Sequence, residues 1–279
     1  MNTNSNFPKL SGFLPKHEER VYSDVGRCIY CGSTQALSDE HIIPYSLGGN
    51  FVLPKSSCAE CARVTSSFEQ TCMRTMYGPL RLLYNLPTRR RKERPEKLPL
   101  KVKFSADQSD WELVDVKQEE YPFLVTFPYF DAPGILAGRP LGESDGPTTN
   151  KLWIRGGCPF ASFDELLPAL ARKLNAHSLF PESKVDVSSF SRLLAKIALS
   201  FAIAEIGTQP FADDLTNIIL GKDLNHCRYY IGSASLDEPP GNMLHELAIL
   251  KFSSNVVVVK IRLLCKLGTP TYFVAVSNN

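Results

Sequence analysis

The sequence contains no secretory signal pattern and no unbroken apolar run of membrane-spanning length. Its first twenty residues are polar and interrupted by prolines, whereas a signal peptide needs an apolar segment before its cleavage site. The most apolar run, Leu193 to Ile206, is interrupted by Lys196 and Glu205. A spanning helix needs roughly 20 apolar residues, so this run predicts a buried helix. We therefore expect a cytoplasmic protein without a membrane partner.

Residues 100–279 also lack a glycine-rich phosphate loop and a Ser/His/Asp arrangement, and the chain shows no internal repeat. The sequence thus indicates neither nucleotide-cradling nor serine-hydrolase chemistry there. The apolar content of 43% and the charged content of 22% are ordinary for a globular protein with a sizeable core. A length of 279 residues suits one small domain and one larger one.

Positive charge is concentrated in one segment. Between Arg81 and Lys103 there are nine basic and two acidic residues, a net charge of +7, so the rest of the chain carries −5. The densest part contains Arg89, Arg90, Arg91, Lys92 and Arg94. Such a cluster predicts a contact with backbone phosphates; a solvated linker is the alternative.

Four of the eight cysteines form two Cys-x-x-Cys units, Cys28/Cys31 and Cys58/Cys61, with 26 residues between them. Two such units can surround one ion with four thiolates, which suits a closed, structural Zn²⁺ site. Chance pairing and a redox Cys-x-x-Cys are the alternatives. The other four cysteines, Cys72, Cys158, Cys227 and Cys265, are scattered, and an unexported chain should keep its thiols reduced.

Between the two units lie Ser38-Asp39-Glu40-His41-Ile42-Ile43-Pro44 and then Leu47-Gly48-Gly49-Asn50. After the second unit, residues 63–77 carry a helical stripe that Gly78-Pro79 should end. This order of cysteines, acidic-His-Ile-x-Pro, Gly-Gly, cysteines and helix resembles the zinc-bearing HNH endonucleases over roughly residues 27–75. The resemblance implies a ββα-metal finger.

The resemblance also implies roles for individual residues. His41 would be the general base, which suits an imidazole that is largely neutral near pH 7. Glu40, where the family more often has Asp, would bind a catalytic Mg²⁺ or Mn²⁺, and Asn50 is a further candidate site residue beside the turn. The family often places His or Asn directly after the last cysteine, where this chain has Ala62. Glu69 lies on the same predicted helix face, and we take it as a substitute ligand.

The organisation that we predict is α+β: a small zinc-stapled finger followed by a larger mixed region. The divisions are a leader (1–24), the finger (25–80), a basic linker (81–99) and a C-terminal region (100–279). In the last of these we expect a hairpin over 100–117, a strand over 121–127, loops over 130–160, a helix from Ser188 or Ser189 to Gly207, a shorter helix over 211–221 and a C-terminal hairpin. Ligand sensing, partner binding and DNA positioning are all open as its role.

The sequence therefore predicts a divalent-metal-dependent endonuclease that hydrolyses phosphodiester bonds in DNA, with RNA left open as a substrate. By analogy with nuclease chains that carry an appended region, a role in phage defence or in a mobile element is expected. The alternative is a zinc-stapled nucleic-acid-binding module without catalysis. Nothing in the sequence indicates the oligomeric state or the identity of a protein partner or small-molecule trigger.

Overall fold

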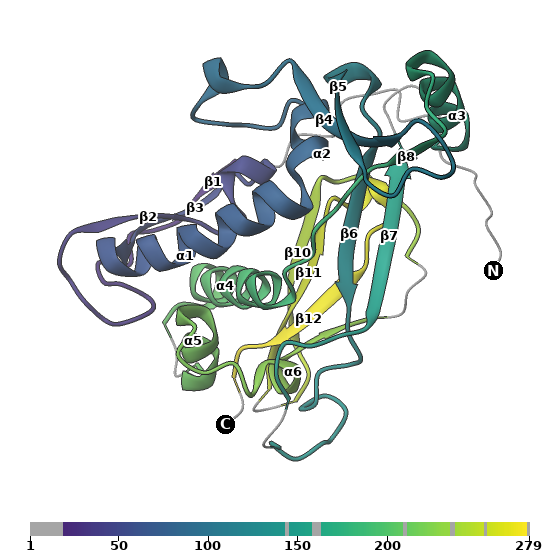
Figure 1. Ribbon diagram of the computed structural model, residues 1–279. Helices are drawn as coiled ribbons and strands as arrows, with labels where there is room; N and C mark the ends of the chain where they lie inside the picture. The colour runs from purple at the N-terminus through teal and green to yellow at the C-terminus, as the bar shows by residue number, and fades with distance from the viewer. Residues whose placement is uncertain are drawn as a thin grey trace.

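The computed structural model describes residues 19–142, 145–157, 163–208, 211–234, 238–253 and 256–277. The described residues mix helices and strands, as the predicted α+β class requires (Figure 1). Most of the predicted leader, and Cys158, lie outside the described residues.

The predicted finger is two antiparallel strands followed by a helix. Strand β2 (Leu37–His41) pairs with β3 (Phe51–Cys58), and α1 (Ala59–Thr71) begins directly after Cys58. A short strand, β1 (Arg20–Val21), lies parallel to β3 on its other side. In Figure 1 these elements form the arm at one side of the molecule, with α1 along its length. The ββα order expected from the sequence is confirmed.

The helix ends before Gly78-Pro79, as predicted, but the sequence did not indicate that a second helix begins there. Helix α1 continues into a π-helical turn, Cys72–Met76, and a second helix, α2 (Gly78–Leu83), starts at the glycine itself. Proline is compatible with a first helical turn because its missing N–H would have no partner there. The same dipeptide therefore serves as a helix start.

The long apolar helix α4 (Val187–Ile206) lies at the centre of the molecule. Its N-terminus is capped by Asp186, whose side chain accepts from the Ser189 backbone N–H at 2.8 Å, so the helix starts just before the serines that we predicted as caps. By length and composition α4 would be able to cross a membrane, but most of its surface is buried inside the protein. It contacts α1 of the finger on one side and strands of the C-terminal sheet on the other.

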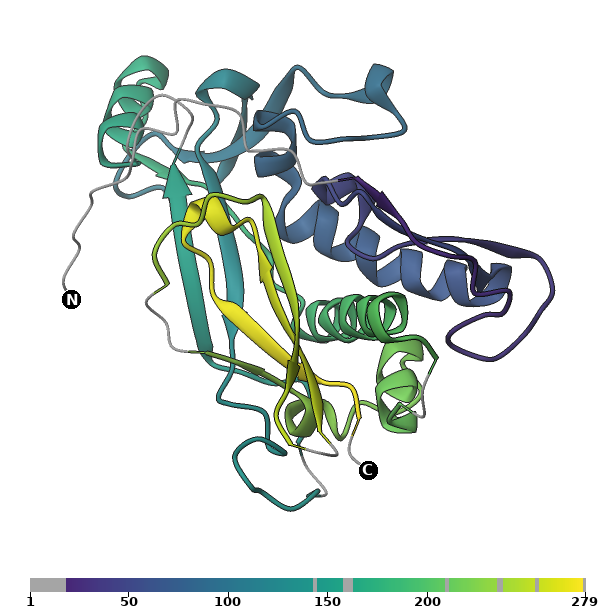
Figure 2. The same cartoon turned by 180° about the vertical axis from the view of Figure 1, so that it is seen from behind.

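Those strands form an antiparallel sheet with the order β10-β11-β12-β9. The bounds are β9 (Ile231–Ser233), β10 (His245–Lys251), β11 (Val257–Leu263) and β12 (Thr271–Ala275). The predicted C-terminal hairpin is the β11–β12 pair. Seen from behind, the sheet lies nearest the viewer and covers part of the rest (Figure 2). Helices α5 (Asp213–Leu220) and α6 (Cys227–Tyr230) follow α4.

The remaining elements form two smaller sheets. One joins β4 (Lys97–Lys103), β5 (Glu112–Lys117) and β8 (Ser178–Phe180), and with α3 (Phe163–Leu174) it encloses a separate small core. The other pairs β6 (Phe123–Tyr129) with β7 (Lys151–Gly157). The predicted hairpin over 100–117 is the β4–β5 pair. The expectation of loops throughout 130–160 is wrong at β7, which pairs along its whole length with β6. Gly156 and Gly157 at the end of this strand are typical of loops and made it look like one in the sequence.

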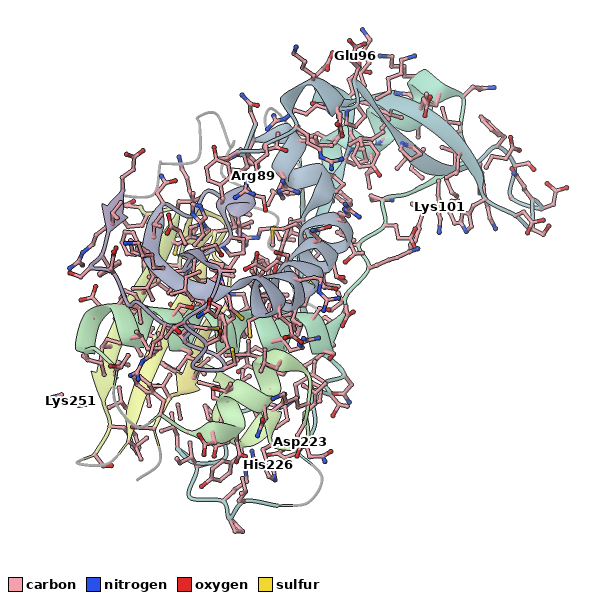
Figure 3. All side chains as sticks on the ribbon, turned by 90° about the vertical axis from the view of Figure 1, so that its left-hand side faces the viewer. Arg89, Glu96, Lys101, Asp223, His226 and Lys251 are labelled. Atoms are coloured by element: carbon pink, nitrogen blue, oxygen red, sulfur yellow. The ribbon has the colours of Figure 1, made fainter. Side chains whose placement is uncertain are left out.

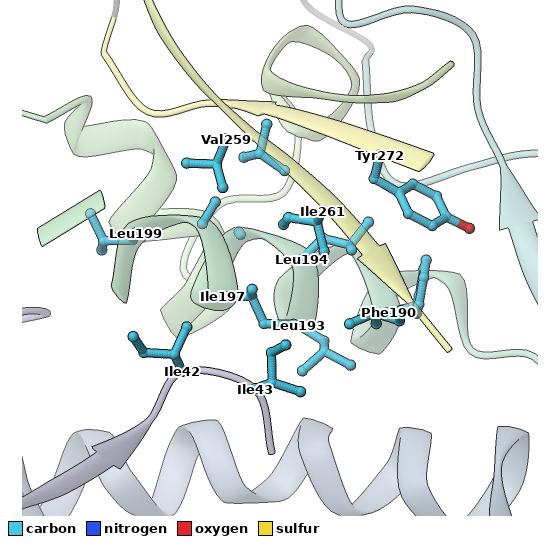
Figure 4. Close-up of a cluster of buried hydrophobic side chains, with 14 of the residues drawn as sticks. Ile42, Ile43, Phe190, Leu193, Leu194, Ile197, Leu199, Val259, Ile261 and Tyr272 are labelled. Carbon is cyan, nitrogen blue, oxygen red and sulfur yellow. The ribbon is translucent and has the colours of Figure 1, made fainter. Parts of the chain in front are cut away.

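The largest hydrophobic core is continuous from the finger into the C-terminal region. Ile42 and Ile43, which directly follow the predicted base, are completely buried. Figure 4 shows them beside Leu193 and Ile197 of α4, with Val259 and other residues of the sheet on the far side of that helix. The segment that carries His41 is therefore held by packing against α4 as well as by its own strand.

Candidate active site

The four paired cysteines meet in one cluster. The Sγ atoms of Cys28, Cys31, Cys58 and Cys61 all lie within 4.8 Å of one another, and those of Cys31 and Cys58 are 3.6 Å apart. Four sulfurs this close suit the tetrahedral ligand set of Zn²⁺. Hydrogen bonding, first from the Cys61 backbone N–H, lowers the pKa of the Cys58 thiol to about 7. Burial raises the pKa of Cys28 and of Cys61, so ionising them requires a cation in the cluster.

The scattered cysteines take no part in this cluster. Cys72, Cys227 and Cys265 are buried as single free thiols.

The turn after the predicted base depends on two glycines. Gly48 has φ of +87°, a backbone conformation that favours glycine. A Cβ at Gly49 would lie 2.1 Å from the carbonyl oxygen of Ile43, which no side chain can tolerate. The Gly48-Gly49 pair therefore lets the chain fold back tightly over the Ile43 backbone, and its role is to shape the loop beside His41.

His41 lies at the end of β2 and lines a cavity of about 370 Å³ between β2, the turn, α1 and the basic segment. The imidazole is half-buried, and its ring centroid is 5.4 Å from that of Tyr45. Burial, then the positive charges of Lys196 and Arg89, lower the pKa of His41 below its usual 6.5, against weaker opposite effects of Glu40 and the Gly49 backbone. The neutral imidazole is thus favoured, and this is the form that accepts a proton.

The rim of the cavity carries many charges. Its arginines come from two parts of the chain, and its carboxylates are supplied by β2 and α1. The arginines are Arg74, Arg81, Arg89 and Arg90, and the carboxylates are Asp39, Glu40 and Glu69. Arg81 is fixed by donating from Nε to the Ser46 carbonyl oxygen at 2.6 Å, which joins α2 to the turn. An anionic ligand would therefore meet several cations beside the His41 imidazole.

Glu40 and Glu69 are brought together, as predicted, but around a cation of the protein itself. The Nζ of Lys196, on α4, lies 2.7 Å from Glu40 Oε1 and 2.9 Å from Glu69 Oε1. Lys196 is completely buried and Glu40 is 7% exposed. The second oxygen of Glu40 accepts from the Tyr30 hydroxyl at 3.1 Å. Burial on its own would lower the pKa of Lys196, but the two carboxylates outweigh it and raise that pKa.

This arrangement does not fit a catalytic divalent cation held by Glu40 and Glu69. Both oxygens of Glu40 already have partners, and the ammonium lies where an ion shared by the two carboxylates would have to bind. The predicted pair of ligands thus stays a prediction, which this geometry does not favour. Of the cavity's carboxylates, Asp39 is exposed, and the Glu69 side chain keeps 20% of its surface accessible.

The other predicted site residues differ in their positions. Asn50 lies in the loop before β3 and outside the lining of the cavity; its carbonyl oxygen accepts from the Arg20 backbone N–H. Arg89 and Arg90 line the cavity, whereas Lys92 is exposed outside it.

Arg94 donates to Asn85 Oδ1 and to the Leu86 carbonyl oxygen, so the segment that follows α2 holds it in place. Arg91 belongs to the short 3-10 helix Arg91–Glu93, and the structure does not describe its side chain.

Sequence reasoning missed Lys196, Tyr30 and Arg74, and it counted Arg81 only as part of the basic segment. Lys196 interrupts an otherwise apolar run, which was a signal that a cation enters the core, but nothing in the sequence named its partners. Tyr30 lies between the two cysteines of the first Cys-x-x-Cys unit. Its contact with Glu40 depends on tertiary structure alone.

The comparisons with known proteins agree with the finger and extend no further. Residues 28–72 match the family model described as HNH endonuclease. No curated protein and no solved structure matches the chain. The matched segment contains both cysteine pairs, the strand with His41 and helix α1 with Glu69. The chain thus carries an HNH endonuclease domain in its N-terminal third, stapled by a four-cysteine cluster that is compatible with zinc.

Proposed function

We propose that the protein is an HNH endonuclease that hydrolyses phosphodiester bonds in DNA, with His41 as the general base. The observation that carries this proposal is the position of His41. Its imidazole lies in a cavity rimmed by arginines, and its pKa is lowered. A water molecule activated by this imidazole would attack a phosphodiester held by the same rim.

The DNA would be held mainly through its phosphates. Arg89 and Arg90 join Arg74 and Arg81 around the cavity, and Figure 3 shows Arg89 beside the finger. Guanidinium groups bind phosphate oxygens in a fixed, planar geometry. This affinity would be strongly salt-dependent and would carry no sequence information. RNA offers the same phosphates and is the second substrate to test.

We further propose that cleavage requires Mg²⁺ or Mn²⁺. Such an ion would offset the negative charge that develops on the leaving oxygen. The exposed carboxylate of Asp39 is the acidic group that the cavity offers to it, because Glu69 is paired with Lys196. Within the chain itself, His41 accepts the proton and the arginines hold the phosphate.

A second candidate function is nucleic-acid binding without cleavage. Two observations favour it: Ala62 stands where the family often has a metal ligand, and Glu40 is paired with Lys196. A zinc-stapled module of this kind would keep the arginine rim and bind phosphates, but would leave them intact. In either case we propose a cytoplasmic protein. By analogy with nuclease chains that carry an appended region, we also propose a role in phage defence or in a mobile element, to which the region after residue 100 would contribute.

The experiment that separates the two functions is incubation of supercoiled plasmid, and of single-stranded RNA, with the zinc-loaded protein and Mg²⁺ or Mn²⁺. Nicked or linear DNA with the wild type supports the endonuclease. Retarded but intact DNA, at every metal concentration, supports the binding module. His41→Ala should abolish this cleavage. Its matched control is His177→Ala, because His177 lies outside the cavity lining and its replacement should leave cleavage unchanged.

A further inference from the structure

A buried lysine is unusual in a helix as apolar as α4. Lys196 is completely buried among Leu193, Leu194, Ala195 and Ile197, which are also fully buried. A charged group without partners at such a position would be strongly destabilising. The lysine is tolerated because the finger supplies acceptors to it, so its partners indicate what it does.

The ammonium group of Lys196 uses its three protons on the finger. Besides Glu40 Oε1 at 2.7 Å and Glu69 Oε1 at 2.9 Å, it approaches two backbone carbonyl oxygens, of His41 and, at 3.3 Å, of Ile42. An ammonium has three donors and no acceptor. Its contacts join β2, α1 and α4, and they hold three consecutive residues, Glu40, His41 and Ile42.

This geometry has two consequences for the candidate base. Donation to the His41 carbonyl fixes the main chain from which the imidazole projects. The ion pair with Glu40, which the Tyr30 hydroxyl supports from the other side at 3.1 Å, fixes the preceding residue. Together these contacts fix the backbone on both sides of the His41 Cα, and the His41 imidazole lines the cavity.

We propose that Lys196 is a positioning residue for His41, and that its ammonium occupies the cation position between Glu40 and Glu69. The role of His41 as base rests on the proposed function; the occupancy of the cation position does not. A buried pair of carboxylates needs a counterion, and this chain supplies one from its own α4. A divalent ion in the cavity must then bind without Glu40.

The test is a titration of the zinc-loaded protein with Mn²⁺, in which the melting temperature is measured at each Mn²⁺ concentration. Lys196→Met keeps the length of the side chain and removes the charge. In the wild type we expect that Glu40→Gln does not alter any effect of Mn²⁺ on the melting temperature. In Lys196→Met we expect a rise of ~5 °C or more at about one hundred times the dissociation constant, since a ligand bound only to the folded state stabilises it. The rise should disappear in Lys196→Met/Glu69→Gln. The matched control is Lys260→Met in β11, because Lys260 pairs with Glu246 and not with Glu40 or Glu69.

Two results overturn the occupancy. One is a Mn²⁺-dependent rise in the wild type that Glu40→Gln removes, because the carboxylates would then be open to metal. The other is a Lys196→Met protein whose melting temperature does not rise with Mn²⁺, or one that stays unfolded both with and without the ion. Neither readout requires cleavage, so a wild type that cuts no nucleic acid would refute the proposed function and still leave this question decided.

Positioning is tested on Lys196→Met/Glu40→Gln/Glu69→Gln, which leaves no charge at this buried position and should fold. We expect the imidazole NMR signals of His41 to shift relative to the wild type, and kcat to fall at least ~10-fold with KM little changed, as for a displaced catalytic group. Unchanged His41 signals and unchanged kcat would show that Lys196 only stabilises the fold.

Discussion

Replacing Cys61 by serine should loosen one segment of the finger while leaving the rest folded. Cys61 is 4% exposed and lies in the first turn of α1, as part of the four-sulfur cluster. Between Val21 and Leu37 the described chain contains no helix or strand. A few backbone hydrogen bonds to β3, such as Ile29 N–H to the Ser56 carbonyl oxygen at 2.8 Å, hold it besides the metal cluster, so residues 22–36 depend on the metal for much of their conformation. Structural zinc contributes ~10–16 kcal/mol to the folding of isolated fingers.

The packing of the finger decides how far the damage spreads. Ile42, Ile43, Leu53 and Phe68 are at most 2% exposed and belong to the core shared with α4. At ~1.5–3 kcal/mol for each fully buried large side chain, these four contribute ~6–12 kcal/mol, an upper estimate because unfolded chains already bury some surface. That is comparable to the contribution of the zinc. We therefore expect β2, β3 and α1 to stay docked when the metal is lost.

Hydrogen–deuterium exchange with zinc quantification measures this directly. Cys61→Ser should lose its zinc and its protection over residues 22–36, keep protection in α4 and β11, and melt several degrees lower in one cooperative transition. Cys72→Ala, a buried thiol outside the cluster, should keep its zinc. A wild type that contains no zinc, or a Cys61→Ser protein with unchanged exchange over 22–36, would show that a metal does not hold this segment.

Three further predictions concern the site. Because burial, Lys196 and Arg89 lower the pKa of His41 below 6.5, and a general base acts in its neutral form, the acid limb of the pH–rate profile should have its midpoint below pH 6.5; a midpoint above 6.5 contradicts this. Arg89→Ala/Arg90→Ala should weaken DNA binding equally for all sequences and reduce the slope of log K against log salt by up to ~1.8, at ~0.9 for each phosphate that is no longer neutralised. Lys251→Ala, at the lower left edge of the molecule in Figure 3 and away from Arg89, should leave the slope unchanged. Glu69→Gln leaves the Lys196–Glu40 ion pair intact, and burial already raises the pKa of Glu69, so kcat should change less than ~10-fold; a larger loss, recovered by excess Mn²⁺, would instead identify Glu69 as a metal ligand.

The finger was predictable from the sequence because its information is local. The spacing of the two cysteine pairs predicted the clustering of Cys28, Cys31, Cys58 and Cys61. The two strands before α1 were predicted by the resemblance of this segment to the HNH endonucleases. The apolar stripe of residues 187–206 likewise predicted its helix, apart from the cap at Asp186.

The interior of the site was not predictable because its partners are far apart in sequence. His41 and Lys196 are 155 positions apart, and Lys196 reaches His41 and Glu40 only because α4 packs beneath the finger. From the sequence alone Glu40 looked like an open ligand, and Lys196 looked like an interruption of a helix. Similarly, Arg74 and Arg81 reach the cavity through the π-helical turn and α2, which the pattern around Gly78-Pro79 did not indicate.

The proposed function depends above all on the His41 imidazole as the group that accepts the proton from water. The most direct test is the single-turnover rate of plasmid nicking by zinc-loaded His41→Ala, at saturating DNA, beside the wild type and His177→Ala. We predict a loss of ~10²–10⁴-fold for His41→Ala, as expected when a general base is removed, with unchanged DNA affinity, zinc content and melting temperature. Nicking by His41→Ala at the wild-type rate would contradict it.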